Sequence, residues 1–398
     1  MTPLLPSPPT PELLEELVEE ILLRLPPDNP ASLFRAALVC RLWRHLVSGA
    51  GFRRRFREFH HTPPLLGVIC NEVYRRRPFA RFLPTSSFRP ARPDKFSYRA
   101  IDARHGRVLL HNTFTVYGRS VINFSIWDPI TGDLQELPSL LCPVIASKKP
   151  RGWNAAVLCA AGHSDHLGCS FMVVFVGIEY EKMFVDIYAP AQESKWIRVA
   201  STRRRYRYDF FKMAPGVVVG NTLYFLALGS NGIVKVDMAT WEISVIDLVH
   251  KFFRRNSVLM TTEDGRLGVA SVYECKLYLW SMEVGSNCRD APRFVVSRVL
   301  DLEKLLPVNT SPRANGFADG VRILFMRTND GLYCIDLNTE QARKGPDCNT
   351  CHDVVPYLNF HTPGLSKLEV KLMIEEGVRL LMECAQKVMA QQQTRPAL

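Results

Sequence analysis

Apolar residues recur at helical spacing near the start of the chain. A first helix is expected to start with Thr10 as N-cap and Pro11 in the first turn, and to end at Pro26-Pro27. Glutamates occupy most of its remaining surface. Its apolar residues form one broad stripe: Leu13, Leu14, Leu17, Val18, Ile21, Leu22 and Leu25.

A second helix is expected from Ala31 to about Val47, and a short basic helix from Gly51 to Phe59. The second helix has two apolar faces, one with Leu33, Ala37, Cys40 and Trp43, the other with Val39, Leu42 and Leu46. In a hairpin the second helix has only one partner helix, which can cover one of its two apolar faces. The face that stays uncovered predicts contact with another protein. The alternative is a helical hairpin packed on the domain that follows.

After Thr62-Pro63-Pro64 the hydrophobic period changes from helical to two, which is typical of strands. One strand pattern recurs and ends in an Asp-x-x-Thr tetrad, whose first residue is Asp128, Asp237 or Asp336. Two looser copies end near Ala189 and Ser281. We interpret these tetrads as turn chemistry, because Asp and Thr side chains hydrogen-bond the backbone of tight turns.

The recurring strands predict stacked meanders. Each copy follows a second strand, and most are followed by a third, at uneven intervals near the length of a propeller blade. Leu65 to Phe88 and the region from Val354 to Phe360 are expected to supply the blade that closes the ring. The pattern favours six blades, with seven as the alternative.

The expected fold class is α+β and multidomain, with a small helical domain before an all-β propeller and a C-terminal helix. The tail is expected to pack on the ring, with a coiled-coil partner site as the alternative. The expected ranges are 1–10 for a flexible N-terminus, 11–60 for the helical domain, 61–362 for the propeller and 363–398 for the C-terminal amphipathic helix and tail.

The net charge of +11 comes from arginine clusters, which begin at Arg53, Arg75 and Arg203. Such clusters are typical of solvated surface, of nucleic-acid contacts or of import signals. Only the third interleaves arginine with tyrosine. The candidate target-binding residues are therefore Arg203, Arg204, Arg205, Tyr206 and Arg207.

The eleven cysteines are odd in number and scattered, which predicts a reducing compartment without disulfides. The sequence shows neither a membrane span nor a secretory signal, so cytoplasm or nucleus is the expected location.

Residue patterns give little support for chemistry. Cys348-Asn349-Thr350-Cys351-His352 fits a haem-attachment pattern, but a zinc site would need further ligands and none stands at suitable spacing. His60-His61 and the pair His163 and His166 are expected in surface turns. No catalytic motif is present, so we expect no enzyme activity, no cofactor and no metal.

The N-terminal helices resemble an F-box, the helical module that binds the Skp-type adaptor of cullin-RING ubiquitin ligases. Leu14 stands where the family usually has proline. The resemblance implies an adaptor-binding surface made of Leu13, Leu14, Leu17, Ile21, Leu22, Leu25, Pro26, Leu38, Val39 and Trp43. The family pattern is also met by Glu16 and Arg41.

The strand-rich part resembles the β-propeller-like domains that follow the F-box in plant proteins, here of the grass type. The two resemblances together imply a substrate-recognition subunit of an SCF-type ligase, which binds the adaptor and, through it, cullin, and holds a target protein on the propeller. Two alternatives remain open from the residues: an enzyme on a propeller scaffold, and a nucleic-acid-binding protein that uses the arginine clusters.

Overall fold

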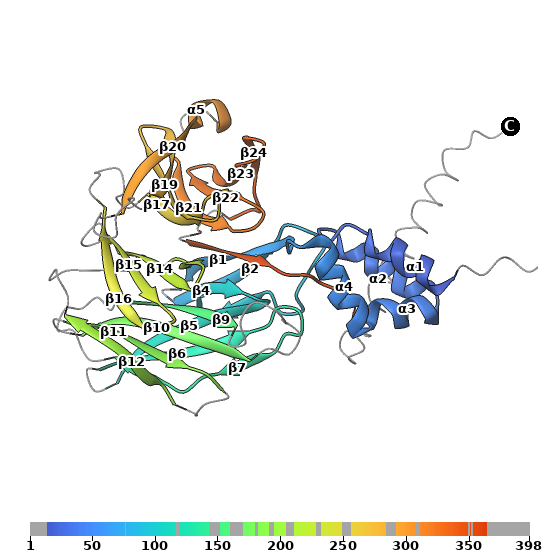
Figure 1. Cartoon of the computed structure of the whole chain (residues 1–398), viewed down its shortest axis with the longest axis horizontal. Helices are drawn as coiled ribbons and strands as arrows, with labels where there is room; N and C mark the ends of the chain where they lie inside the picture. The colour runs from blue at the N-terminus through green and yellow to red at the C-terminus, as the bar shows by residue number, and fades with distance from the viewer. Residues whose placement is uncertain are drawn as a thin grey trace, which may run out of the picture. The chain divides into compact units, whose positions relative to one another are not determined.

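The computed structural model describes residues 14–363, except 76, 117–118, 143–151, 160–169, 180–181, 191–194, 204–210, 228–231, 249–255, 284–291, 308–310, 349–350 and 352. The chain divides into two compact units (Figure 1). One comprises residues 1–63 and 360–398, and the other residues 64–359. The expected C-terminal helix lies outside the described residues.

The first unit contains four described helices: α1 (Glu15–Leu23), α2 (Pro30–Val39), α3 (Arg41–Ser48) and α4 (Ala50–His60). The expected start at Pro11 is wrong. Leu14 occupies the N-cap with extended backbone, and Glu15 and Glu16 lie in the first turn, where carboxylates interact favourably with the helix dipole. The basic helix after Gly51 is confirmed as α4.

The expected second helix is two helices, because Cys40 breaks it. The backbone at Cys40 is extended, and its sulfur accepts a hydrogen bond from the Trp43 N–H at 3.5 Å, which caps α3. The break redirects the chain between Val39 and Arg41. The prediction of a two-helix hairpin is therefore wrong, since α1, α2, α3 and α4 share one core.

The core of the helical unit combines residues of the N-terminal helices with one residue that follows the propeller. Phe52 and Phe56 of α4 pack against Val18 and Leu22 of α1, and Phe360 joins them from far along the sequence. Its ring meets that of Phe56 edge-on at a centroid distance of 6.0 Å. The other buried members are Leu23, Leu33, Phe34, Ala36, Ala37 and Val47.

The second unit is a six-bladed β-propeller over the described residues. Five sheets have four strands and one has five. The blades are, in chain order, β1 (Leu65–Tyr74), β2 (Arg77–Pro84), β3 (Asp94–Phe96) with β25 (Asp353–Leu358); β4 (Arg99–Arg104), β5 (Arg107–Val116), β6 (Arg119–Trp127), β7 (Leu134–Glu136), β8 (Leu140–Cys142); β9 (Trp153–Cys159), β10 (Phe171–Glu179), β11 (Lys182–Tyr188), β12 (Ile197–Arg203); β13 (Val217–Val219), β14 (Thr222–Ala227), β15 (Gly232–Asp237), β16 (Glu242–Asp247); β17 (Ser257–Thr261), β18 (Leu267–Tyr273), β19 (Lys276–Glu283), β20 (Arg293–Asp301); β21 (Arg313–Ala318), β22 (Ile323–Thr328), β23 (Gly331–Asp336) and β24 (Gln341–Lys344). A short helix, α5 (Leu302–Leu305), follows β20.

The ring closes as the sequence predicted. Strand β25, from the far end of the unit, pairs antiparallel with β1, so that Cys70 lies opposite Val354. Each pair of neighbouring blades then shares a buried apolar cluster, including the pair formed by the first and sixth blades. Every sheet therefore has both faces covered by its neighbours.

The innermost strands β4, β9, β13, β17 and β21 were missed by the sequence pattern. They are short and contain small residues such as Ala100, Ala155, Ala156, Ala314 and Gly316. An added Cβ at Gly316 would lie 2.7 Å from the Val354 carbonyl oxygen of β25. Strands that approach each other this closely need small side chains, and such strands lack the apolar alternation that marks the others.

The Asp-x-x-Thr turns are confirmed where the pattern is complete. A carboxylate oxygen of Asp128, Asp237 and Asp336 accepts the backbone N–H groups two and three residues later. The looser copy that ends near Ser281 is confirmed as a strand, because β19 is the third strand of its blade, as β15 and β23 are of theirs. The turn expected at Ser281 is wrong, because Ser281 lies within β19.

The expectation of no disulfide is wrong at Cys159, which is disulfide-bonded at the end of β9. The cysteines described as free are Cys40, Cys70, Cys275, Cys334, Cys348 and Cys351. None of the described helices has the length and apolar character of a membrane span.

Candidate protein-binding interface

Helix α1 carries two apolar rows that face different surroundings. Val18 and Leu22 are 2% exposed and belong to the helical core. Leu14, Leu17 and Ile21, spaced three and four residues apart, are 66, 51 and 54% exposed. The broad stripe expected from the sequence is thus divided, and half of it lies on the surface.

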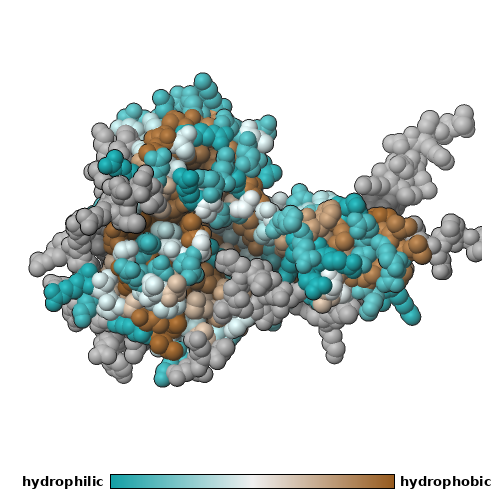
Figure 2. Space-filling model, in the orientation of Figure 1, coloured by the Kyte–Doolittle hydropathy of each residue, from teal (hydrophilic) through white to brown (hydrophobic). Residues whose placement is uncertain are grey.

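A second group of exposed apolar side chains surrounds the Cys40 break. Leu38 and Val39 end α2 and Leu42 begins α3, with exposures of 42, 64 and 42%. Leu38 and Val39 directly follow the buried residues Ala36 and Ala37 in α2, and Leu42 lies just after the break. Figure 2 shows hydrophobic surface on the helical unit, where an isolated small unit would expose mainly polar groups.

The remaining predicted adaptor contacts differ from one another in how far they are buried. Leu22 is a core residue, so its assignment to the binding surface is corrected: its position on α1 points it toward α4 and Phe360. Leu25 and Trp43 are half-buried at the edge of that core, and Pro26 is exposed. Leu13 lies outside the described residues. Leu42 was not in the predicted set, although the sequence placed it on an uncovered face and it is exposed in the structure.

An ion pair fixes α1 against α4. Glu19 is 8% exposed and accepts a hydrogen bond from Arg55, the third arginine of the first basic cluster. His60 Nε2 lies 2.9 Å from the Leu23 carbonyl oxygen. Residues from the basic cluster and the expected histidine turn therefore take part in packing the helices, which supports a structural reading for them.

The arginine-tyrosine candidates for target binding are only partly described. Arg203 ends the outermost strand β12 and is exposed. Arg204, Arg205, Tyr206 and Arg207 lie outside the described residues, as do His163 and His166.

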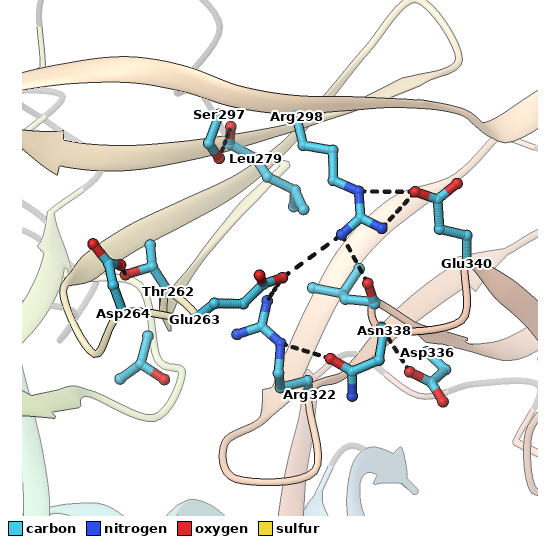
Figure 3. A network of polar contacts seen from close by, with 12 residues as sticks. Thr262, Glu263, Asp264, Leu279, Ser297, Arg298, Arg322, Asp336, Asn338 and Glu340 are labelled. Carbon is cyan, nitrogen blue, oxygen red and sulfur yellow. Dashed lines mark hydrogen bonds and ion pairs between the residues drawn. The ribbon is translucent and has the colours of Figure 1, made fainter.

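A charged network joins the fifth and sixth blades (Figure 3). The Arg298 guanidinium of β20 donates to Glu340 Oε1, through Nε at 2.9 Å, and to the Leu337 carbonyl oxygen. Arg322 donates to Glu263 at 3.1 Å and to Asn338 at 3.1 Å. Two guanidinium groups and two carboxylates balance one another here. These ion pairs and hydrogen bonds connect the fifth blade to the sixth.

Two charged groups beside or on the inner strands also link blades. Asp102 of β4 accepts the Val157 N–H of β9 at 3.0 Å and the Arg104 Nε at 3.0 Å. Lys212 Nζ donates to the Ser257 carbonyl oxygen of β17 at 2.7 Å, and burial lowers the pKa of Lys212 to about 8. Each charge has a partner from the fold itself, an arrangement that stabilises the ring.

Comparison with known proteins identifies the helical segment. Residues 11–55 match the model of the F-box domain. The search among curated proteins found no match to this chain.

Two of the similar solved structures match this chain at low identity. The β-propeller domain of Cps50 (Swd1) from Myceliophteria thermophila is 13% identical, with 71% of this chain and 87% of that chain covered and a TM-score of 0.38. A putative 6-phosphogluconolactonase from Bacteroides uniformis is 9% identical over 73% of this chain and 99% of its own, with a TM-score of 0.39. At these values the similarities support no inference about function. Residues 11–55 thus form an F-box domain, and the strands from Leu65 to Leu358 form a six-bladed β-propeller.

Proposed function

We propose that this protein is the substrate-recognition subunit of an SCF-type ubiquitin ligase. The observation that carries the proposal is the F-box match over residues 11–55, on helices that leave Leu17, Ile21 and Val39 more than half exposed. Large apolar side chains in such numbers on a small helical unit favour burial against a partner protein. The proposed partner is a Skp-type adaptor and, through it, a cullin.

The proposed adaptor contacts are the exposed members of the predicted set, together with Leu42. They are Leu14, Leu17, Ile21, Pro26, Leu38 and Val39, with Trp43 supporting the surface from its half-buried position. Leu13 belongs to the proposed set from its sequence pattern. Burying one such leucine typically contributes about 1.5–3 kcal/mol, so several together suffice for a stable complex.

The propeller is proposed to hold the target protein. A subunit of this kind catalyses nothing itself; it raises the effective concentration of the target near a ubiquitin-loaded enzyme. Arg203 and the residues that follow it are proposed target contacts on the strength of their sequence. A cytoplasmic or nuclear location and a plant origin of the grass type are likewise proposed from the sequence.

The test is binding of the purified full-length chain to a Skp-type adaptor. The double variant Leu17→Asp with Ile21→Asp should weaken binding by at least about a hundredfold, because two charges would enter an apolar contact. The full chain is needed, because a fragment ending at Phe59 would lack Phe360 of the helical core.

Val296→Asp is the matched control. Val296 is an equally apolar residue, 44% exposed on β20 of the propeller, and its substitution should leave adaptor affinity unchanged. If the double variant binds as tightly as the unmodified chain, the adaptor-binding proposal is refuted. Affinity capture that returned nucleoprotein or a metabolic complex in place of adaptor and cullin would favour one of the rival functions.

A further inference from the structure

Three buried cysteines meet where the propeller ring closes. Cys70 lies on β1, near the start of the propeller, while Cys348 and Cys351 lie between β24 and β25, near its end. Their sulfur atoms are all within 4.8 Å of one another, and the residues are 0, 5 and 1% exposed. The fold thus joins thiols that are 278 residues apart in sequence.

The cluster lies in the apolar junction between the sixth and first blades. Its neighbours there include Val68 and Val354, on the two strands that pair to close the ring, and Phe325 from the sixth blade. Three thiols in this junction offer soft ligands shielded from water. Thiolates in such surroundings suit zinc, which in structural sites takes four ligands at tetrahedral geometry.

The spacing of the atoms agrees with that geometry. Zinc–sulfur bonds of about 2.3 Å at tetrahedral angles put sulfur atoms roughly 3.8 Å apart, which a small inward shift from the observed limit would reach. A carboxylate oxygen in the same shell would lie about 3.6 Å from each sulfur. Glu72 Oε1 lies 3.5 Å from Cys348 Sγ. Its carboxylate is not within 4.8 Å of all three sulfur atoms, so a change of rotamer would have to bring it into the shell.

Glu72 is suited to be the fourth ligand because of strand geometry. It stands two residues after Cys70 on β1, so both side chains emerge on the same face of the sheet. Its side chain is half-buried and already accepts a hydrogen bond from Cys348. His352, a potential ligand by residue type, lies outside the described residues.

We propose that Cys70, Cys348, Cys351 and Glu72 form a structural zinc site that fastens the last blade of the propeller to the first. Binding displaces the thiol protons to solvent and leaves three thiolates and one carboxylate on the metal. The four ligands leave no open position for a substrate or water. The sequence analysis predicted no metal, because Cys70 is far from the other two cysteines in the sequence. Only the closure of the ring brings the three together.

The first test is metal content of the full-length chain, purified under reducing conditions and equilibrated with zinc. Mass spectrometry of the metal should find about one zinc per chain. Cobalt substituted for zinc should give the thiolate-to-cobalt absorption of a three-sulfur site. Zinc should also raise the melting temperature of the propeller, and a chelator should lower it again.

Matched variants locate the site. Cys70→Ser and Cys351→Ser should each lose the bound zinc. Cys334→Ser is the control: Cys334 is free, 3% exposed and in the same apolar junction, but is not one of the three clustered sulfurs. It should keep zinc even if it lowers stability. Glu72→Gln should weaken zinc binding by about tenfold or more while the three-sulfur cobalt spectrum persists.

Several results would overturn the proposal. Reduced wild-type chain that holds no zinc would do so, as would full zinc content in Cys70→Ser, or a disulfide between Cys348 and Cys351 that resists the reductant. If the serine variants fail to fold, the cobalt spectrum of the wild-type chain decides, because the number of bound thiolates is read from it directly.

Discussion

The helical unit and the propeller solve the burial of apolar surface in different ways. In the propeller, each sheet has two neighbouring sheets, and six shared clusters cover the blades around the ring. In the helical unit, four short helices have one another and Phe360, and α1 still leaves Leu17 and Ile21 more than half exposed.

This difference separates residues that hold a fold from residues left for a partner. Ring closure supplies a neighbour for every blade, so apolar residues of the propeller are mainly accounted for within the chain. The four described helices have no such closure among themselves. The exposed row of α1 is therefore as apolar as a core but is not buried. In the proposed complex the adaptor would cover this row.

The largest expected effect comes from a cavity in the propeller. Phe175 is fully buried on β10, with its ring centroid within about 6 Å of those of Phe124, Trp153 and Phe184. Phe175→Ala should lower the free energy of unfolding by about 3–5 kcal/mol in urea titrations. Adaptor affinity should stay within twofold; a large loss would show that the two units are not independent.

A pair of identical substitutions tests the division of α1. Leu22→Ala should cost about 2–5 kcal/mol of stability, because it opens a cavity beside Val18 and Phe56, whereas Leu17→Ala should cost less than about 0.5 kcal/mol. The order should reverse for adaptor affinity, with Leu17→Ala the more damaging when both variants are measured folded. Equal stability losses would contradict the observed difference in burial.

Acid should destabilise both units through buried histidines. Burial lowers the pKa of His361, in the helical unit, to about 4, and burial and then the nearby Arg99 lower that of His111, in the propeller, to about 3. Unfolded chains take up these protons near pH 6.5, so stability present above that pH is lost as pH falls. Each histidine should cost about 2 kcal/mol between pH 6.5 and 5.

His361→Phe sharpens this comparison, because the ring stacking on Phe34 is retained while the titrating group is removed. Calorimetry over the same pH range should show a flatter acid dependence for the helical transition alone. An unchanged slope would mean that His361 is protonated in the folded chain.

The smallest expected effect concerns the blade turns. The Asp336 carboxylate accepts the N–H groups of Asn338 at 2.8 Å and Thr339 at 3.4 Å. Asp336→Ala should lower propeller stability by about 1 kcal/mol, since two backbone donors lose their acceptor. Asp336→Asn keeps an acceptor oxygen and should restore most of the loss in thermal unfolding; equal losses would show that charge matters more than hydrogen bonding.

The sequence by itself determined the elements whose cause is local. The period change after Thr62, the Asp turns and the strands at Leu65–Tyr74 and near Val354 could all be predicted, because alternation and turn chemistry are encoded by near neighbours. The F-box resemblance was likewise visible in residues 11–55.

Only the tertiary structure decided which half of the α1 stripe is covered, that Cys40 divides a helix, and that the inner strands exist. It also joined Cys70 to Cys348 and Cys351 across nearly the whole propeller. These features depend on which distant segments become neighbours. Periodicity shows that a side chain is apolar, but the packing of other parts of the chain decides whether anything covers it.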